Sequence, residues 1–279
     1  MSRYLDVEGP IALAHRGFSA PSASGALENS LSAFAAAVDL GYRYLETDVH
    51  ATSDGVLVAF HDPTLDRATD GRGPIATQPW SVVSRARIAG VEPVPRLEEA
   101  LAAWPHVRFN LDVKARGAIA PLVRVLTTAG AVDRVCIASF SERRRRAVLA
   151  GLAAAGHRSV ASSASRQGVV RFLAAVGAGL RGRALRAAVG ADCLQVPERS
   201  GRLPVLTERT LAAARSARLP VHVWTVDEPA QMRRLLDAGV DGLVTDRADL
   251  LRAVLAERGQ WPAPPTPSRI PAPDEETRP

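Results

Sequence analysis

The chain has 279 residues, 47% of them hydrophobic, and a mean hydropathy near zero, so it is long and apolar enough to bury a sizeable core. No run of about 18 uninterrupted apolar residues is present, which argues against a segment that spans a membrane. The net charge is +6, but only 5% of the residues are aromatic and they do not interleave with the arginines, so we expect no nucleic-acid partner.

Eight short apolar runs have the length and composition of β-strands, and Ala- and Leu-rich helical patterns lie between most of them. This alternation predicts an α/β fold, a (βα)8 TIM barrel, with a doubly wound open sheet as the alternative. The predicted strands cover residues 11–15, 44–50, 107–114, 134–140, 158–164, 192–196, 221–226 and 242–246. The clearest predicted helices cover residues 30–40, 142–155, 207–218, 228–238 and 248–257.

Capping signals support the helix predictions. Asn29-Ser30 can cap the first helix, and Gly41 can end it. The arginine run at 143–146 follows Ser141-Glu142 and precedes an apolar stretch, so we expect it on the solvated face of a helix.

The chain is predicted to contain one folded domain over residues 1–258. Residues 52–105 form an insertion after the second strand, because they carry turn signals and an additional strand-like run at 56–60. Residues 259–279 are rich in proline and are predicted to be a disordered tail.

The cysteines and the first residues bear on location. Cys136 and Cys193 lie in strand-like runs and are typical of small buried apolar residues, so they predict neither a disulfide framework nor a cysteine metal site. The first residues lack the basic start and apolar run of a signal peptide. We therefore expect a cytoplasmic protein, and the sequence leaves its oligomeric state open.

Polar groups cluster at the ends of the first predicted strands. His15 and Arg16 follow the first, Glu46 and Asp48 lie in the second, and His61 follows the additional strand. On a barrel the carboxyl ends of the strands converge on one rim, where such enzymes place their chemistry. Two imidazoles, a guanidinium and two carboxylates on one rim indicate cleavage of a phosphate ester.

The third barrel strand carries the only lysine of the chain. Asn110, Asp112 and Lys114 alternate with apolar residues, so they share one face of this strand. Lys114 is a compact charge suited to a phosphate oxygen. With Glu46 and Asp48, Asp112 completes an all-oxygen set that favours a hard divalent cation, Mg²⁺ or Ca²⁺, over zinc.

These motifs, in this order, resemble those of the glycerophosphodiester phosphodiesterase family across residues 11–255. The matching stretches are residues 14–17, 28–30, 46–49, 54–62, 65–69, 110–114, 139–140 and 223–226. The resemblance implies a TIM barrel, a divalent metal, and hydrolysis of a glycerophosphodiester to an alcohol and glycerol 3-phosphate. One departure is Asp227, which follows Trp-Thr-Val where the family usually has Asn, and it is expected to alter either a hydrogen bond at the rim or the substrate preference.

The resemblance also implies roles for individual residues. His15 and His61 correspond to the general acid/base pair. The remaining predicted site residues are the metal ligands Glu46, Asp48 and Asp112, the phosphate contacts Arg16 and Lys114, and the further substrate contacts Phe140 and Trp224.

Two other functions stay open at the level of sequence. One is a phospholipase D-type enzyme that acts on lysophospholipids, which needs an apolar channel at the rim. The other is a barrel that binds phosphate without catalysis, against which the presence of both His15 and His61 argues.

Overall fold

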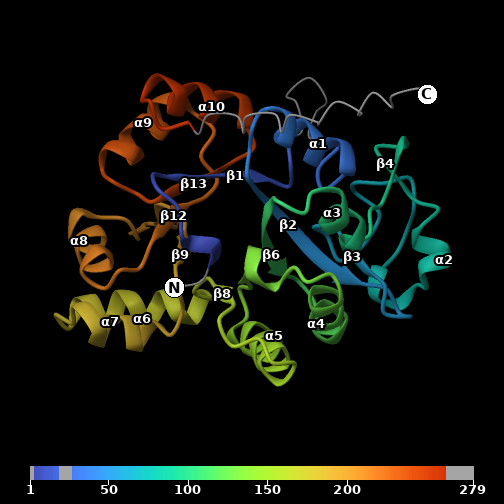
Figure 1. The fold of residues 1–279 in the computed structure, drawn as a ribbon, viewed down its shortest axis with the longest axis horizontal. Coiled ribbons are helices and arrows are strands. Elements are labelled where there is room, and N and C mark those ends of the chain that lie inside the picture. The colour runs from blue at the N-terminus through green and yellow to red at the C-terminus, as the bar shows by residue number, and fades with distance from the viewer. Residues whose placement is uncertain (1–2, 19–26, 262–279) are drawn as a thin grey trace, which may run out of the picture.

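The computed structural model describes residues 3–18 and 27–261, and its centre is a ring of eight parallel strands inside a layer of helices (Figure 1). The strands follow the order β8-β7-β6-β2-β1-β13-β12-β9, and a parallel bridge between Ser163 and Cys193 joins the two ends of this order. The predicted (βα)8 barrel is therefore confirmed, and the doubly wound alternative is wrong. The ring consists of β1 (Ile11–His15), β2 (Tyr44–Ala51), β6 (Arg108–Val113), β7 (Val135–Ala138), β8 (Ala161–Ser162), β9 (Leu194–Val196), β12 (Val221–Val223) and β13 (Gly242–Thr245).

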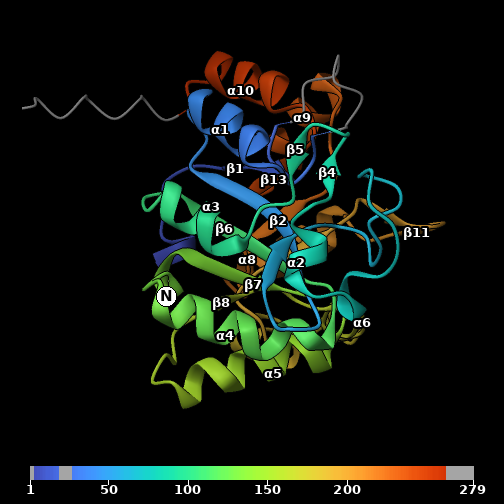
Figure 2. The same cartoon turned by 90° about the vertical axis from the view of Figure 1, so that its right-hand side faces the viewer.

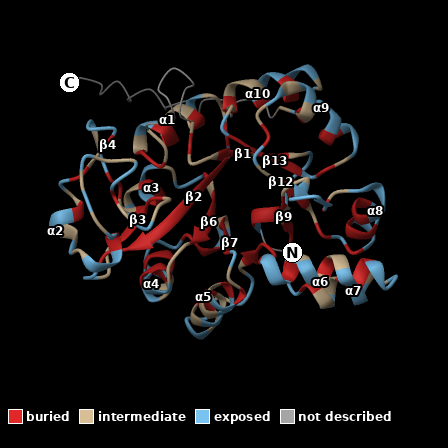
Figure 3. Cartoon of the chain, turned by 180° about the vertical axis from the view of Figure 1, so that it is seen from behind, coloured by how far each residue is buried: buried red, intermediate tan, exposed pale blue. Residues whose placement is uncertain are grey.

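The helices pack around the strands, which are buried, and present their outer faces to solvent (Figure 3). The first helix begins where Ser30 accepts a hydrogen bond from the amide of Ala33 at 3.1 Å, and Gly41 follows its end with φ of 95°. All five predicted helices are present. The helices around the ring are α1 (Leu31–Asp39), α3 (Leu97–Ala103), α4 (Ile119–Thr128), α5 (Glu142–Ala154), α6 (Arg166–Gly177), α7 (Gly182–Val189), α8 (Glu208–Ser216), α9 (Pro229–Asp237) and α10 (Ala248–Glu257).

The segment between β2 and β6 folds over one side of the barrel around a small core of its own (Figure 2). Its first strand, β3 (Leu57–Ala59), confirms the additional strand predicted at 56–60, and it pairs antiparallel with the end of β2. An antiparallel hairpin also follows the carboxyl end of β9. The remaining short elements are α2 (Trp80–Val83), β4 (Arg87–Ile88), β5 (Glu92–Pro93), β10 (Arg199–Ser200) and β11 (Leu203–Pro204).

Tyr4, from a short 3-10 helix at Arg3–Leu5, fills the opposite end of the barrel. Its ring meets the ring of Tyr44 edge to face at 5.1 Å. Cys136 and Cys193 lie in the same buried cluster as free thiols, as predicted. Among the described residues no helix is long and apolar enough to cross a membrane.

The packed part of the chain continues past the predicted boundary at residue 258. The ring of Trp261 packs against that of Tyr42, with 5.0 Å between the centroids. Residues 262–279, most of the predicted tail, lie outside the described residues.

The expectation that the whole arginine run is solvated is wrong for Arg145. This side chain is 2% exposed and pairs with Glu142 through two hydrogen bonds of 3.0 Å. A helix turns one of four consecutive residues toward its packed face, and Glu142 in the first turn compensates the buried charge.

Candidate active site

A cavity of about 430 Å³ opens at the carboxyl ends of the barrel strands. Residues from all eight barrel strands or the turns that follow them line it, together with His61 from the segment after β2. The nine residues that the sequence predicted for the site all line this cavity: His15, Arg16, Glu46, Asp48, His61, Asp112, Lys114, Phe140 and Trp224.

Strand register explains why residues distant in sequence meet here. Glu46 of β2 is paired with His15 of β1, and Asp48 is paired with Asp112 of β6. Because these neighbouring strands are parallel and in this register, the side chains lie side by side and line one cavity.

His15 is held between two carboxylates. Its Nδ1 lies 2.7 Å from Oδ1 of Asp246, which follows β13, and its Nε2 lies 3.8 Å from Oε2 of Glu46. Burial acts to lower the pKa of His15, but the hydrogen bond to Asp246 and the charge of Glu46 outweigh it and raise the pKa above its usual value. The contact with Asp246 also fixes the orientation of the imidazole ring, so that Nε2 is the atom near Glu46.

His61 has a carboxylate of its own. Its Nδ1 lies 2.6 Å from Oδ1 of Asp62. Hydrogen bonds from Arg67, followed by the one from His61, lower the pKa of Asp62 to about 2, so Asp62 is charged at neutral pH. Arg67 also contacts Glu28, which in turn accepts a hydrogen bond from Arg16 at 2.9 Å. This chain of charged groups connects the His61 side of the rim to the His15 side.

The carboxylates at the floor of the site are buried and closely spaced. Burial, and then the charge of Asp48, raise the pKa of Glu46 to about 7. Burial acts in the same direction on Asp48, but the charges of Lys114 and Arg16 outweigh it and lower the Asp48 pKa. The ammonium of Lys114 lies 2.8 Å from Asp48 and 2.7 Å from Asp112, so it bridges two of the three predicted metal ligands.

Asn29 supports this floor. Its side-chain amide donates to Asp48 at 3.1 Å and accepts from the hydroxyl of Thr47 at 2.6 Å. Of the two predicted capping residues, Ser30 caps the helix. Asn29 adopts φ of 61° and its side chain is directed inward to the carboxylate of Asp48.

The donor set is compatible with a hard divalent cation. As the side chains stand, no three His, Cys, Asp or Glu groups within residues 3–18 and 27–261 are arranged to hold an ion, and Lys114 occupies the space between Asp48 and Asp112. Even so, Oδ1 of Asp112 is buried and has no hydrogen-bond partner among the described residues, and Glu46 is a buried carboxylate whose ionisation needs a nearby cation. Both observations fit a ligand group of Glu46, Asp48 and Asp112 for Mg²⁺ or Ca²⁺.

One wall of the cavity is apolar. Phe140 and Trp224 meet edge to face at 5.9 Å, and Lys114 and Arg166 lie 6.0 and 5.7 Å from the Phe140 ring. The wall continues along α6 and the β10–β11 hairpin, where Val170 and Leu203 are 61% and 57% exposed. The cavity therefore has an apolar wall, which can contact an apolar part of a ligand, beside its charged floor.

Several residues that shape the site were not predicted to belong to it. Asp246, Glu28 and Asn29 each bond a predicted site residue, and Arg67 bonds Asp62, the partner of His61; Glu28, Asn29 and Arg67 lie inside the motifs that carry the family resemblance. For Asp246 the available signal was its place directly after the last barrel strand. Asp227, the departure from the family pattern, accepts hydrogen bonds from Thr245 and from the amide of Asp246, and so anchors the turn that presents Asp246.

Comparison with known sequences agrees with this geometry. A profile of the glycerophosphoryl diester phosphodiesterase family matches residues 15–250. A probable glycerophosphodiester phosphodiesterase 2 from Mycobacterium tuberculosis is 45% identical over 258 residues, which is 92% of this chain and 95% of the relative.

Solved structures give the same result for the fold. A glycerophosphodiester phosphodiesterase from Agrobacterium tumefaciens is 26% identical and superposes with a TM-score of 0.69 over 88% of this chain and 99% of its own. A phosphodiesterase from Oleispira antarctica, solved with the product sn-glycerol-3-phosphate, is 21% identical, with a TM-score of 0.70 over 89% of this chain and 97% of its own.

Proposed function

Since this chain belongs to the glycerophosphoryl diester phosphodiesterase family of hydrolytic enzymes, we propose that it cleaves small glycerophosphodiesters to an alcohol and sn-glycerol 3-phosphate. The observation that carries this proposal is the pair His15 and His61, each oriented by its own carboxylate and both facing one cavity that Arg16 and Lys114 make basic. A barrel that only bound phosphate would not need two such oriented imidazoles.

Charge dictates how the cavity would hold the substrate. A phosphodiester is anionic, and negative charge builds on its non-bridging oxygens during attack at phosphorus. Arg16 and Lys114 are placed to pair with these oxygens, while Glu28 and the floor carboxylates keep both cations charged and oriented. A divalent cation held by Glu46, Asp48 and Asp112 would supply further stabilisation of the same charge.

The two histidines would divide the proton transfers. One imidazole accepts a proton from the attacking hydroxyl, either of water or of the substrate, and the other donates a proton to the departing alkoxide. Asp246 and Asp62, at 2.7 and 2.6 Å, hold the Nδ1 protons, so the Nε2 atoms are left for this exchange. The raised pKa of His15 suits the proton-donating role, because more of it is protonated near neutral pH.

Assay of the purified protein with glycerophosphocholine and Mg²⁺ or Ca²⁺ tests the proposal, with release of glycerol 3-phosphate as the measured product. His15→Ala and His61→Ala are expected to abolish release while the thermal unfolding midpoint stays near that of the parent. Chelation by EDTA is expected to stop turnover, and added divalent ion to restore it. No turnover of any glycerophosphodiester by the parent protein would refute the enzymatic proposal.

The apolar wall favours a second candidate substrate class, the lysophospholipids. Val170 and Leu203 lie on the cavity lining and are more than half exposed, so an acyl chain could lie along them while the phosphodiester meets the basic floor. Replacement of both by Ser is expected to lower turnover of lysophosphatidylcholine and to leave that of glycerophosphocholine unchanged. Equal effects on the two substrates would remove the case for lysolipids.

A cytoplasmic site of action is part of the proposal. Its support is the pair of buried free thiols, Cys136 and Cys193, which suits a reducing compartment. Cell fractionation with detection of the protein in the membrane or exported fraction would contradict it.

A further inference from the structure

The active-site cavity contains an uncharged polar pair that the proposed proton transfers and phosphate contacts do not use. Asn110 of β6 and Gln195 of β9 both line this cavity, and the side-chain amide of Gln195 donates to Oδ1 of Asn110 at 2.9 Å. Asn110 is 4% exposed and lies two residues before Asp112 on the same strand. The two side chains share a face of β6, so Asn110 lies one step deeper in the barrel than Asp112.

The orientation of the Gln195 amide is fixed from two sides. Its Nε2 atom lies near Oδ1 of Asn110 and also lies 3.4 Å from Nδ1 of His222, the residue paired with Gln195 across β9 and β12. His222 is completely buried, and burial lowers its pKa to about 4, so the imidazole is neutral near pH 7 and can accept a hydrogen bond. Both hydrogens of the Gln195 amide therefore have acceptors inside the barrel.

Each member of the pair keeps one polar atom free. Oε1 of Gln195 and Nδ2 of Asn110 form no hydrogen bond within residues 3–18 and 27–261, and neither atom is sealed from solvent. Because both residues line the cavity, they present one acceptor and one donor to it. Turning both amides over would again leave one acceptor and one donor free.

Small side chains leave room beside this pair. The strands β7 and β8 lie between β6 and β9 in the ring, and they contribute only small residues to this part of the cavity lining. These residues are Ala138 at the end of β7, and Ser163 and Ala164 directly after β8. A small polar group of a ligand can therefore reach the free atoms of Asn110 and Gln195.

The rest of the cavity indicates which part of a substrate lies there. The phosphate is assigned above to Arg16 and Lys114, and the exposed Val170 and Leu203 border the opening, where the variable alcohol can extend toward solvent. The glycerol moiety, which all glycerophosphodiesters share, is the part left for the inner space. Its hydroxyl groups both donate and accept hydrogen bonds, so they match a free acceptor beside a free donor.

We propose that Gln195 is a specificity-determining residue that, together with Asn110, binds the hydroxyl groups of the glycerol moiety. Oε1 of Gln195 accepts from one hydroxyl, and Nδ2 of Asn110 donates to the same hydroxyl or to its neighbour. The two amides are joined by a hydrogen bond of 2.9 Å, so one glycerol moiety can reach both. This inference rests on the proposed function, because it assigns the glycerol part of the same substrate.

Calorimetric titration with glycerol 3-phosphate and with propyl phosphate, both in the presence of Mg²⁺, tests the proposal. The two ligands carry the same phosphate and differ only in the hydroxyl groups. The parent protein is expected to bind glycerol 3-phosphate about 100-fold or more tightly, because propyl phosphate leaves the polar atoms of the site unpaired. Gln195→Met keeps the length of the side chain and removes its polar atoms, so this preference is expected to fall about tenfold or more.

A matched control makes the same chemical change outside the cavity. Gln231→Met replaces a half-buried glutamine of α9 and is expected to bind both ligands as the parent does. Equal affinity of the parent for the two ligands would overturn the proposal, as would a parent-like preference in Gln195→Met. Binding of these ligands needs no turnover, so the test stays decisive even if glycerophosphocholine is not hydrolysed and the proposed function fails.

Discussion

Replacement of Asp246 by Asn isolates the role of one carboxylate in the proposed chemistry. The substitution keeps a hydrogen-bond acceptor of the same size 2.7 Å from Nδ1 of His15 but removes the negative charge. Hydrogen bonds to charged groups contribute roughly 1.5–3 kcal/mol, and the Asp246 side chain is 50% exposed, so solvent screening places this contact near the lower end. About 1.4 kcal/mol corresponds to a factor of ten, so kcat/KM is expected to fall about tenfold.

The pH profile distinguishes a positioning role from a merely structural one. Because Asp246 raises the pKa of His15, its replacement lowers that pKa, and the limb of the kcat/KM profile that reports His15 shifts to lower pH. Asp237→Asn, which removes an exposed carboxylate on α9 that pairs with Arg258, is the matched control and should leave both quantities unchanged. A parent-like rate and profile for Asp246→Asn would refute the reasoning.

Three further outcomes follow from the buried charges. Lys114→Met is expected to lower kcat/KM about 100-fold or more, because it removes a positive charge at the phosphate and leaves Asp48 and Asp112 to repel each other. Steady-state kinetics measures this loss, and a loss of less than tenfold would contradict the prediction. Glu142→Gln leaves Arg145 uncompensated and is expected to cost about 3 kcal/mol in the free energy of unfolding at pH 7. Because the pKa of Glu142 is held near 2, the difference in the free energy of unfolding between this variant and the parent should vanish as the pH falls from about 4.5 toward 2. Urea titrations measure this difference, and its persistence at low pH would contradict the prediction. Burial raises the pKa of Glu46 to about 7, so between pH 4.5 and 7 the folded protein retains a proton that the unfolded protein loses. Without metal, the free energy of unfolding should therefore fall by up to about 3 kcal/mol as the pH rises through this range. Glu46→Gln should make the free energy of unfolding less dependent on pH in the same range.

Much of the site could be predicted from the sequence because the fold places strand ends together. Once eight βα units are recognised, every polar residue at the end of a strand is assigned to one rim, and the structure brings His15, Glu46, Asp48, Asp112 and Lys114 to that rim. The register of these strands depends on which face each one buries, and it pairs Asp48 with Asp112.

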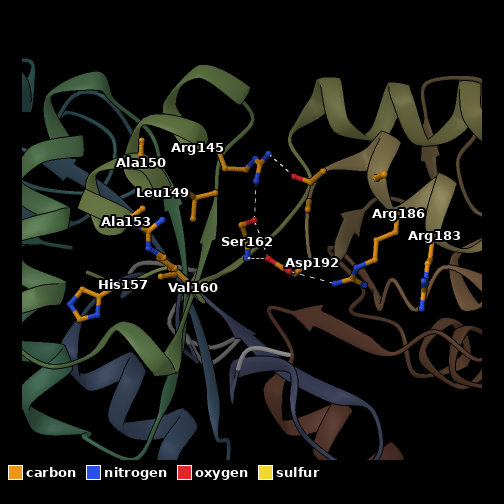
Figure 4. Close-up of a pocket in the computed structure, with 14 residues that line it drawn as sticks. Arg145, Leu149, Ala150, Ala153, His157, Val160, Ser162, Arg183, Arg186 and Asp192 are labelled. Atoms are coloured by element: carbon orange, nitrogen blue, oxygen red, sulfur yellow. Dashed lines mark hydrogen bonds and ion pairs between the residues drawn. The ribbon is translucent and has the colours of Figure 1, made fainter. Parts of the chain in front are cut away.

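Features that depend on contacts across the barrel could not be predicted in this way. Asp246 meets His15 although 231 residues separate them, and a single aspartate after a strand is also a common helix cap. Arg145 was expected in solvent, because the four arginines carry no local sign of which one turns inward. The apolar wall joins α6 to the β10–β11 hairpin, and another cavity lies between α5 and α7 (Figure 4), so each exists only after the helices have packed.

The most direct test of the account is phosphodiester hydrolysis by parent protein, His15→Ala and His61→Ala under identical conditions. The parent is expected to release glycerol 3-phosphate from glycerophosphocholine and neither variant is, while all three proteins unfold at similar temperatures. Release at the parent rate by either folded variant would contradict the claim that two carboxylate-oriented histidines carry the reaction.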